Sequence, residues 1–288
     1  MQLQKLVNMF GGDLTRRYGQ KVHKLSLHGG FSCPNRDGTL GRGGCTFCNV
    51  ASFADETQQH LSIQQQLAQQ VARVDRARRY LAYFQAYTNT YAPLSYLERI
   101  FTEAIEHEDI VGLSIGTRPD CLPDETLDLL SELNKKKPVT VELGLQTIHE
   151  RTAAFIRRGY KLSCFEDALE KLQERKLETV VHTILGLPGE TTEDILETMR
   201  YLNAHHIDGI KLQLLHVLKH TDLADYYRQT GFHILSEDEY VDLVIRCLEM
   251  LSPDITIHRL TGDGPSDLLI APLWSLKKRS VLNHIHHE

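Results

Sequence analysis

Three cysteines of this 288-residue chain share one glycine-rich segment and could hold a metal centre. Cys33, Cys45 and Cys48 lie in the stretch CPNRDGTLGRGGCTFC, and no fourth cysteine lies nearby. Soft thiolates select iron–sulfur clusters or zinc. A cubane of four irons needs four ligands, so three thiolates leave one iron open to a ligand that is not protein.

Zinc and a disulfide are the alternatives for these thiols. A structural zinc site would need a fourth ligand, and His28 and His60 are close enough in sequence, but such sites usually pair their ligands as two short knuckles and only one is present. The N-terminal residues MQLQKLVN are no signal peptide, and a cytoplasmic chain keeps its thiols reduced. The isolated Cys121, Cys164 and Cys247 are interpreted as small buried hydrophobes.

Composition predicts a soluble, cytoplasmic globular protein. Hydrophobic residues make up 41% and charged residues 24% of the chain. No apolar run approaches the roughly 18 residues of a membrane span, so we expect no membrane association.

Positive charge is concentrated near the cysteines. The net charge of −6 argues against a general nucleic-acid binder, DNA included, but residues 1–50 hold seven Lys or Arg and two Asp. A basic collar would suit an anionic substrate that approaches the cluster. Its further members would be Arg73, Arg76, Arg78, Arg79, Lys277, Lys278 and Arg279, although a solvated helix face is the alternative for the first four.

Short apolar runs alternate with helical patterns along most of the chain. The predicted strands are Val22–Leu27, Tyr80–Ala86, Ile110–Gly116, Val139–Leu145, Thr179–Leu185, Gly209–Leu215 and Ile255–Leu260. The predicted helices are Ser62–Arg79, Leu94–Glu106, Asp124–Lys135, Cys164–Arg175, Thr192–His205, Asp222–Thr230 and Ser236–Leu251.

Strands and helices in succession predict an α/β fold with a parallel sheet. Seven strands fit a partial barrel better than a closed eight-stranded one. We expect a single domain over residues 1–288, with a core at about 20–260 and a C-terminal extension at about 261–288 packed on the same barrel. The histidines at positions 284, 286 and 287 are expected in a solvated tail.

Unusual segments follow four of the predicted strands, where the reactive groups of such barrels belong. They are the cysteine loop, GTRPD at 116–120, GLQT at 144–147 and GLPGE at 186–190. Together, the three-cysteine loop with Phe47, GTRPD, ELGLQT and GLPGET resemble a radical S-adenosylmethionine (SAM) enzyme. More narrowly, the chain resembles the bacterial YtqA/YhcC group, related to the catalytic subunit of Elongator. Eleven residues separate the first two cysteines here, instead of the three of the common superfamily form.

The resemblance implies a partial (β/α)6-type barrel, a [4Fe–4S] cluster on Cys33, Cys45 and Cys48, and SAM bound to the open iron. Reduction of SAM would give a 5'-deoxyadenosyl radical that abstracts hydrogen from the substrate. An electron donor such as flavodoxin or ferredoxin is implied as a partner. Phe47 would lie against the adenine, or merely shield the cluster.

Further cofactor contacts are expected on the same rim. The Gly-Gly-Glu segment of the superfamily is missing, and Gln85, Thr88 and Asn89 stand in its place as possible acceptors. Gly186 and Gly189 would lie near the adenine or form a tight turn.

Several polar residues of the strands and their ends are also candidates. Glu142, inside a strand, would bind ribose hydroxyls or the methionine ammonium, with a salt bridge to Arg118 as the alternative. Gln146 could bind either of these two groups of SAM. Arg118 could fork onto a carboxylate, including that of SAM, and Asp120 is expected to cap the next helix. Candidate substrate contacts are Lys211 and Gln213 on the sixth strand, and Arg36 and Arg42 at the entrance.

The resemblance also suggests a substrate. The Elongator-like relatives act on the wobble uridine of tRNA, but this chain ends at Glu288 and has no room for the acetyltransferase domain of that reaction. We therefore expect removal of the glycine-derived portion of carboxymethylaminomethyluridine, which leaves aminomethyluridine. A wobble base is single-stranded and enters a pocket easily. A small metabolite or a peptide as substrate, and a zinc-stabilised RNA-binding module, are the alternatives.

Overall fold

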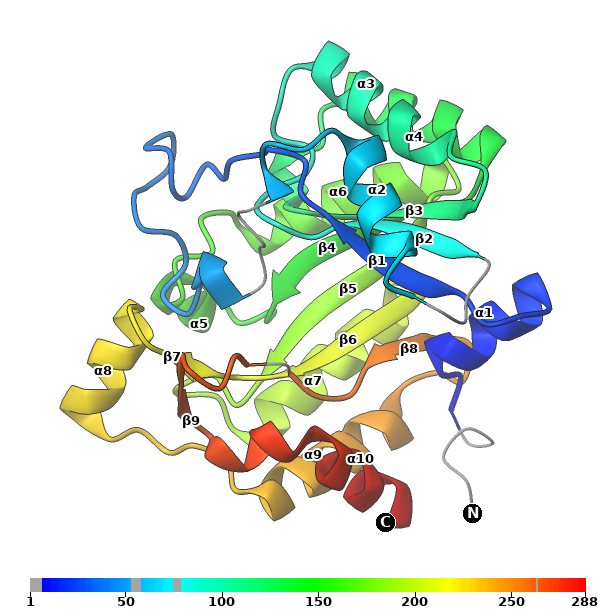
Figure 1. Ribbon diagram of the computed structural model, residues 1–288. Coiled ribbons are helices and arrows are strands. Elements are labelled where there is room, and N and C mark those ends of the chain that lie inside the picture. The colour runs from blue at the N-terminus through cyan, green and yellow to red at the C-terminus, as the bar shows by residue number, and fades with distance from the viewer. Residues whose placement is uncertain (1–6, 53–57, 75–78, 263) are drawn as a thin grey trace.

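Seven parallel strands form one curled sheet in the computed structural model of the chain, which describes residues 7–52, 58–74, 79–262 and 264–288 (Figure 1). Their order is β1-β2-β3-β4-β5-β6-β8, and each neighbouring pair is parallel. The predicted partial α/β barrel is therefore confirmed. The strands are β1 His23–Leu27, β2 Tyr80–Phe84, β3 Ile110–Thr117, β4 Val139–Gln146, β5 Glu178–Leu185, β6 Gly209–Leu214 and β8 Thr256–Arg259.

Burial on both faces explains why these strands stood out in the sequence. All five residues of β2 are buried, as are seven of the eight residues of β3. Parallel strands covered on both faces read as apolar runs rather than as an alternation.

Helices cover the outer, convex face of the sheet (Figure 1). In α3, Leu97, Ile100, Phe101 and Ala104 form the buried stripe that an amphipathic helix needs. Capping boxes fix the starts of α2, α7 and α9. The helices of this layer are α2 Ile63–Val71, α3 Leu94–Ile105, α4 Asp124–Lys136, α6 Leu162–Glu174, α7 Thr192–Ala204 and α9 Glu237–Met250.

Some elements differ from the prediction. Helix α2 ends at Val71 instead of Arg79, and Arg76 and Arg78 lie outside the described residues. Helix α8 has the predicted bounds, Asp222–Thr230. The elements that the sequence did not predict are α1 Phe10–Tyr18, α5 Glu150–Phe155, β7 Val217–Leu218, β9 Leu269–Ala271, α10 Lys278–His287, and the 3-10 turns η2 Val50–Ser52, η4 Pro119–Cys121 and η5 Leu273–Lys277.

The C-terminal residues form a docked helix instead of a tail, although His286 and His287 on that helix are exposed as expected. Val281 and Ile285 are buried in the main core, and His284 Nδ1 lies 3.3 Å from Glu237 Oε1 of α9. Helix α10 lies across the half-barrel from the loop that follows β1 (Figure 1). The cations at positions 277–279 therefore do not belong to a collar around the cysteines.

No helix within the described ranges is both long and apolar enough to cross a membrane.

Candidate functional site

The three cysteines line one cavity inside the half-barrel. This cavity has a volume of about 220 Å³, and Cys33, Cys45 and Cys48 share its wall with residues of β2 to β6 and the segments after them. Tight turns shape the loop: the Arg36 N–H donates to Cys33 O at 2.8 Å, and the Cys48 N–H donates to Cys45 O at 3.0 Å.

Segments beside α5, β7 and α8 anchor the cysteine loop; α5 and β7 were absent from the prediction, whereas α8 was predicted. The Thr46 N–H donates to Ile156 O, next to α5, at 3.1 Å, and Thr46 O accepts from the Leu223 N–H of α8 at 2.9 Å. Asn49 Nδ2 donates to Lys219 O, just after β7, at 2.8 Å. Helices α5 and α8 thus hold the cysteines against the end of the barrel.

The two histidines considered as a fourth zinc ligand do not share the cavity of the cysteines. His28 and His60 line other cavities than the one with the cysteines.

The donor set fits a multi-iron cluster. Asn35 Nδ2 lies 3.4 Å from Cys45 Sγ, and Arg36 Nη2 lies 3.2 Å from Cys48 Sγ. Burial, with the neighbouring Cys48 adding to it, raises the pKa of Cys45 to about 11. Metal ligation would therefore be what holds this sulfur as a thiolate. Three soft sulfurs, two of them with N–H donors, suit a cluster that keeps one iron open to SAM.

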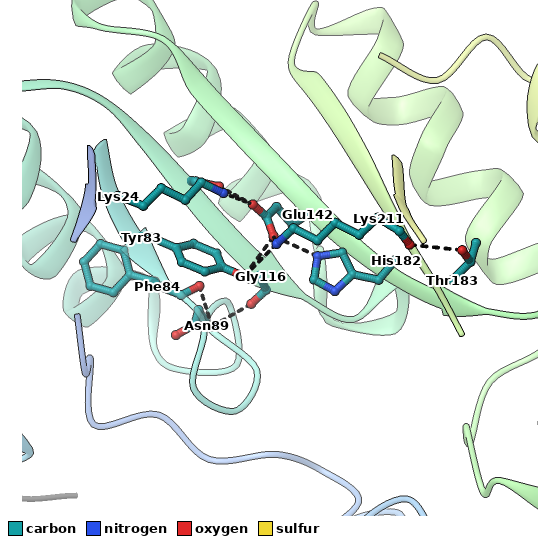
Figure 2. A network of polar contacts seen from close by, with 10 residues as sticks. Lys24, Tyr83, Phe84, Asn89, Gly116, Glu142, His182, Thr183 and Lys211 are labelled. Carbon is teal, nitrogen blue, oxygen red and sulfur yellow. Dashed lines mark hydrogen bonds and ion pairs between the residues drawn. The ribbon is translucent and has the colours of Figure 1, made fainter. Parts of the chain in front are cut away.

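A buried carboxylate organises the interior of the barrel. Glu142 Oε1 lies 2.7 Å from Lys24 Nζ and 2.6 Å from Ser114 Oγ, and Oε2 lies 3.0 Å from Tyr83 OH and 2.7 Å from His182 Nε2. Lys211 Nζ also pairs with Oε2 (Figure 2). We call these six residues, Lys24, Tyr83, Ser114, Glu142, His182 and Lys211, the Glu142 network; strands β1 to β6 contribute one each.

Electrostatics set the protonation states in the Glu142 network. Burial alone would raise the pKa of Glu142, but Lys211 and Lys24 hold it well below its usual range. Burial lowers the pKa of Lys211, and Glu142 opposes that shift. Burial and Lys211 lower the pKa of His182 to about 4, so the ring is neutral at pH 7. A neutral ring that donates Nε2–H to Glu142 keeps Nδ1 as an acceptor.

Arg118 and Asp120 differ from their expected roles. Arg118 donates two hydrogen bonds to Asp120, each at 2.8 Å, so the salt bridge with Glu142 that was the alternative for that carboxylate is not formed. Asp120 is no helix cap either: the N-cap position of α4 is occupied by Pro123, and no side chain of the described residues caps that helix. The guanidinium that could have forked onto the carboxylate of a ligand therefore already binds that of Asp120.

Seven of the other candidates line the cavity with the cysteines: Arg36, Phe47, Gln85, Arg118, Glu142, Gln146 and Gln213. Thr88 lines it too, whereas Asn89 Nδ2 donates to Phe84 O and Gly116 O and supports the turn after β2 (Figure 2).

Four candidates lie elsewhere. Lys211 is buried, with its ammonium bound to Glu142 and Tyr83, and Arg42 is exposed. Gly186 and Gly189 have φ of 89° and 84°. A Cβ on Gly186 would meet Leu235 at 3.1 Å, and Gly189 O accepts from Arg151, so these glycines form a packed turn.

Sequence reasoning missed Tyr83, His182, Arg158 and Tyr160, which also line the cavity. Arg158 is 2% exposed and donates to Thr147 O at 2.6 Å. The guanidinium carbons of Arg118 and Arg158 lie 5.1 and 4.8 Å from the centre of the Tyr160 ring. The available signal was a histidine or tyrosine inside an apolar strand, as in TVVHTIL and YLAYF.

Two family models match consecutive parts of the chain. The family model described as Radical SAM superfamily matches residues 36–202, and the Radical_SAM C-terminal domain matches residues 207–288. Protein YhcC of Escherichia coli K12 is 50% identical over 275 residues, which cover 95% of this chain and 89% of that protein. YtqA of Bacillus subtilis is 42% identical over 289 residues, which cover 99% of this chain and 90% of that protein.

More distant similarity extends to Elongator. Elongator complex protein 3 of Schizosaccharomyces pombe is 28% identical over 162 residues, which cover 55% of this chain and 29% of that protein. The solved structure of archaeal Methanocaldococcus infernus Elp3 superposes with a TM-score of 0.65 at 16% identity and covers 86% of this chain and 58% of that one. The chain thus spans less than two thirds of either relative, and the superposition is evidence for the fold.

Proposed function

The chain belongs to the radical SAM superfamily, whose enzymes use a [4Fe–4S] cluster and SAM, and from this we propose that Cys33, Cys45 and Cys48 hold the cluster. The observation that carries the proposal is the cavity that joins these sulfurs to Tyr83, Glu142 and His182. When bound, cluster and SAM supply a 5'-deoxyadenosyl radical to a substrate in this cavity.

The protein's own residues would bind and orient the reactants and exclude water. Phe47, Gln85 and Gln146 line the cavity and are the candidate SAM contacts. The Glu142 network holds Tyr83 and His182 in fixed positions, because hydrogen bonds to Glu142 bind both side chains. Such a preorganised polar wall can orient a substrate without rearrangement.

The substrate we propose is the wobble uridine of tRNA, with carboxymethylaminomethyluridine converted to aminomethyluridine. The relationship to Elongator supports this class of substrate. The cavity wall carries Arg36, Arg118 and Arg158, and Arg42 is exposed on the same loop as Arg36, so positive charge lies close to the cavity that a flipped base would enter. Flavodoxin or ferredoxin would supply the electron.

Nucleoside mass spectrometry of tRNA tests the substrate. A strain without this protein should accumulate carboxymethylaminomethyluridine and lose its aminomethyl derivative, and the wild-type gene, but not one encoding Cys45→Ala, should restore the pattern. Unchanged wobble nucleosides across growth conditions would refute the tRNA substrate.

Anaerobic reconstitution tests the chemistry separately. We expect a brown protein that forms 5'-deoxyadenosine after reduction. Production of 5'-deoxyadenosine together with unchanged tRNA would point to a small metabolite or a peptide, whereas a colourless protein with stoichiometric zinc would support an RNA-binding module.

A further inference from the structure

We propose that Arg36 and Asn35 raise the reduction potential of the cluster by donating hydrogen bonds to its cysteine sulfurs. Both residues belong to the eleven-residue stretch between Cys33 and Cys45, where the common superfamily form has three residues. The inference rests on the proposed ligation by the three cysteines. The stretch between Cys33 and Cys45 would then tune the cluster as well as form part of the substrate entrance.

Arg36 is fixed against Cys48. Its Nη2 lies 3.2 Å from Cys48 Sγ and 2.7 Å from Cys48 O, so one guanidinium nitrogen contacts both the sulfur and the backbone of the ligand residue. Gly44, at φ 85°, leaves the space for it: a Cβ there would lie 2.9 Å from the guanidinium. Arg36 was a candidate for substrate binding, but its guanidinium contacts Cys48, a proposed ligand of the cluster.

Asn35 plays the same part for Cys45. Its side chain is buried, with Nδ2 3.4 Å from Cys45 Sγ and 2.8 Å from Arg157 O. A Cβ on Gly159, at φ 85°, would lie 2.8 Å from Asn35 Oδ1, so this amide also sits in a space that a glycine keeps open. One N–H of the amide donates to Arg157 O, which fixes the orientation of the amide and leaves its nitrogen, not its oxygen, beside the sulfur.

The direction of the effect follows from charge. Reduction adds negative charge to the cluster and its sulfurs, and N–H donors and a nearby cation stabilise that state. Arg36 supplies both a donor and a positive charge, whereas Asn35 supplies a neutral donor. Loss of Arg36 should therefore lower the potential more than loss of Asn35.

A redox titration followed by electron paramagnetic resonance tests this on the reconstituted full-length protein. At the wild-type midpoint, Arg36→Gln should lower the ratio of reduced to oxidised cluster at least tenfold, a shift of about 59 mV for a one-electron couple. Arg36→Lys keeps the charge and should recover part of the shift. Arg42→Gln, on the same loop but exposed, is the matched control and should change the ratio less than threefold.

Iron and sulfide content separates the proposed cluster ligation from the proposed effect of Arg36 and Asn35 on the reduction potential. A wild-type protein without a cluster would overturn the ligation and this inference with it. A fully loaded Arg36→Gln protein with the wild-type midpoint would overturn the inference alone. If Arg36→Gln does not retain its cluster, Asn35→Ser decides: a lowered midpoint supports the role of the loop donors, and an unchanged midpoint refutes it.

Discussion

Replacing Glu142 by glutamine should destabilise the barrel strongly. The substitution keeps the shape of the side chain but removes the only carboxylate of the Glu142 network, where Lys24 and Lys211 both pair with it. The Glu142 side chain is 0% exposed and that of Lys211 is 5% exposed, so the remaining ammonium would lie in the interior without its counter-charge.

The expected loss is about 3 kcal/mol. Removing one partner of a buried ion pair costs roughly 3–5 kcal/mol. The lower end applies because the Lys24 side chain is 22% exposed and can regain water. A domain of this size loses roughly 2–4 °C of melting temperature per kcal/mol, so a decrease of roughly 6–12 °C should accompany Glu142→Gln.

Urea unfolding followed by far-UV circular dichroism measures this change. Glu132→Gln is the control, because Glu132 is 68% exposed and pairs with Lys135 on the same helix, and its effect should stay within about 0.5 kcal/mol. Adding Lys211→Met to Glu142→Gln removes the orphaned ammonium and should restore at least about 1 kcal/mol. A loss below about 1 kcal/mol for Glu142→Gln, or strict additivity in the double variant, would refute the reasoning.

Three further predictions concern the cysteines, pH and the C-terminal helix. Cys45→Ala should abolish bound iron and 5'-deoxyadenosine formation while circular dichroism stays unchanged; persistent SAM cleavage would contradict the ligand assignment. Because the pKa of Glu142 is lowered in the folded state, its stabilisation is present above the unfolded value of about 4.3 and is lost as pH falls toward the folded pKa. Melting curves of wild type and Glu142→Gln should therefore converge below about pH 4.3, and a constant gap would count against it. Ile285→Ala, at a 1% exposed site, should cost about 2–5 kcal/mol, whereas the exposed His287→Ala should not; equal melting temperatures would contradict the docking of α10.

The sequence predicted the barrel well because its strands are buried on both faces and its helices carry regular apolar stripes. Helix α1 was missed because FGGDLTRRY contains two glycines that disfavour a helix. Distant contacts hold it: Phe10 stacks on His258 with ring centres 4.0 Å apart, and Leu14 is buried. The short β7 and β9 pair with each other across about fifty residues of chain, which no local pattern shows.

The cysteines of the candidate site were predictable from the sequence, whereas the partners of Glu142 were not. The cysteines share one short segment, and together with the segments after three further strands they predicted a metal centre. The partners of Glu142 are far away in the chain, Lys24 by 118 residues and Lys211 by 69, and only the curl of the sheet brings them together. Their residue types gave a weak signal, because a single lysine or histidine in a strand is compatible with many environments.

The Glu142 network also determines how tightly the sheet is rolled. Strands β1 and β6 are five strand spacings apart in the sheet order, a distance of about 24 Å if the sheet were flat. Lys24 and Lys211, from these two strands, nevertheless meet on one carboxylate. A half-barrel has no closing hydrogen bonds between its first and last strands to set its radius. The ion pairs of Glu142 with Lys24 and Lys211 connect the strands across the interior instead. The width of the cavity that the cysteines line therefore depends on the Glu142 side chain in its wall.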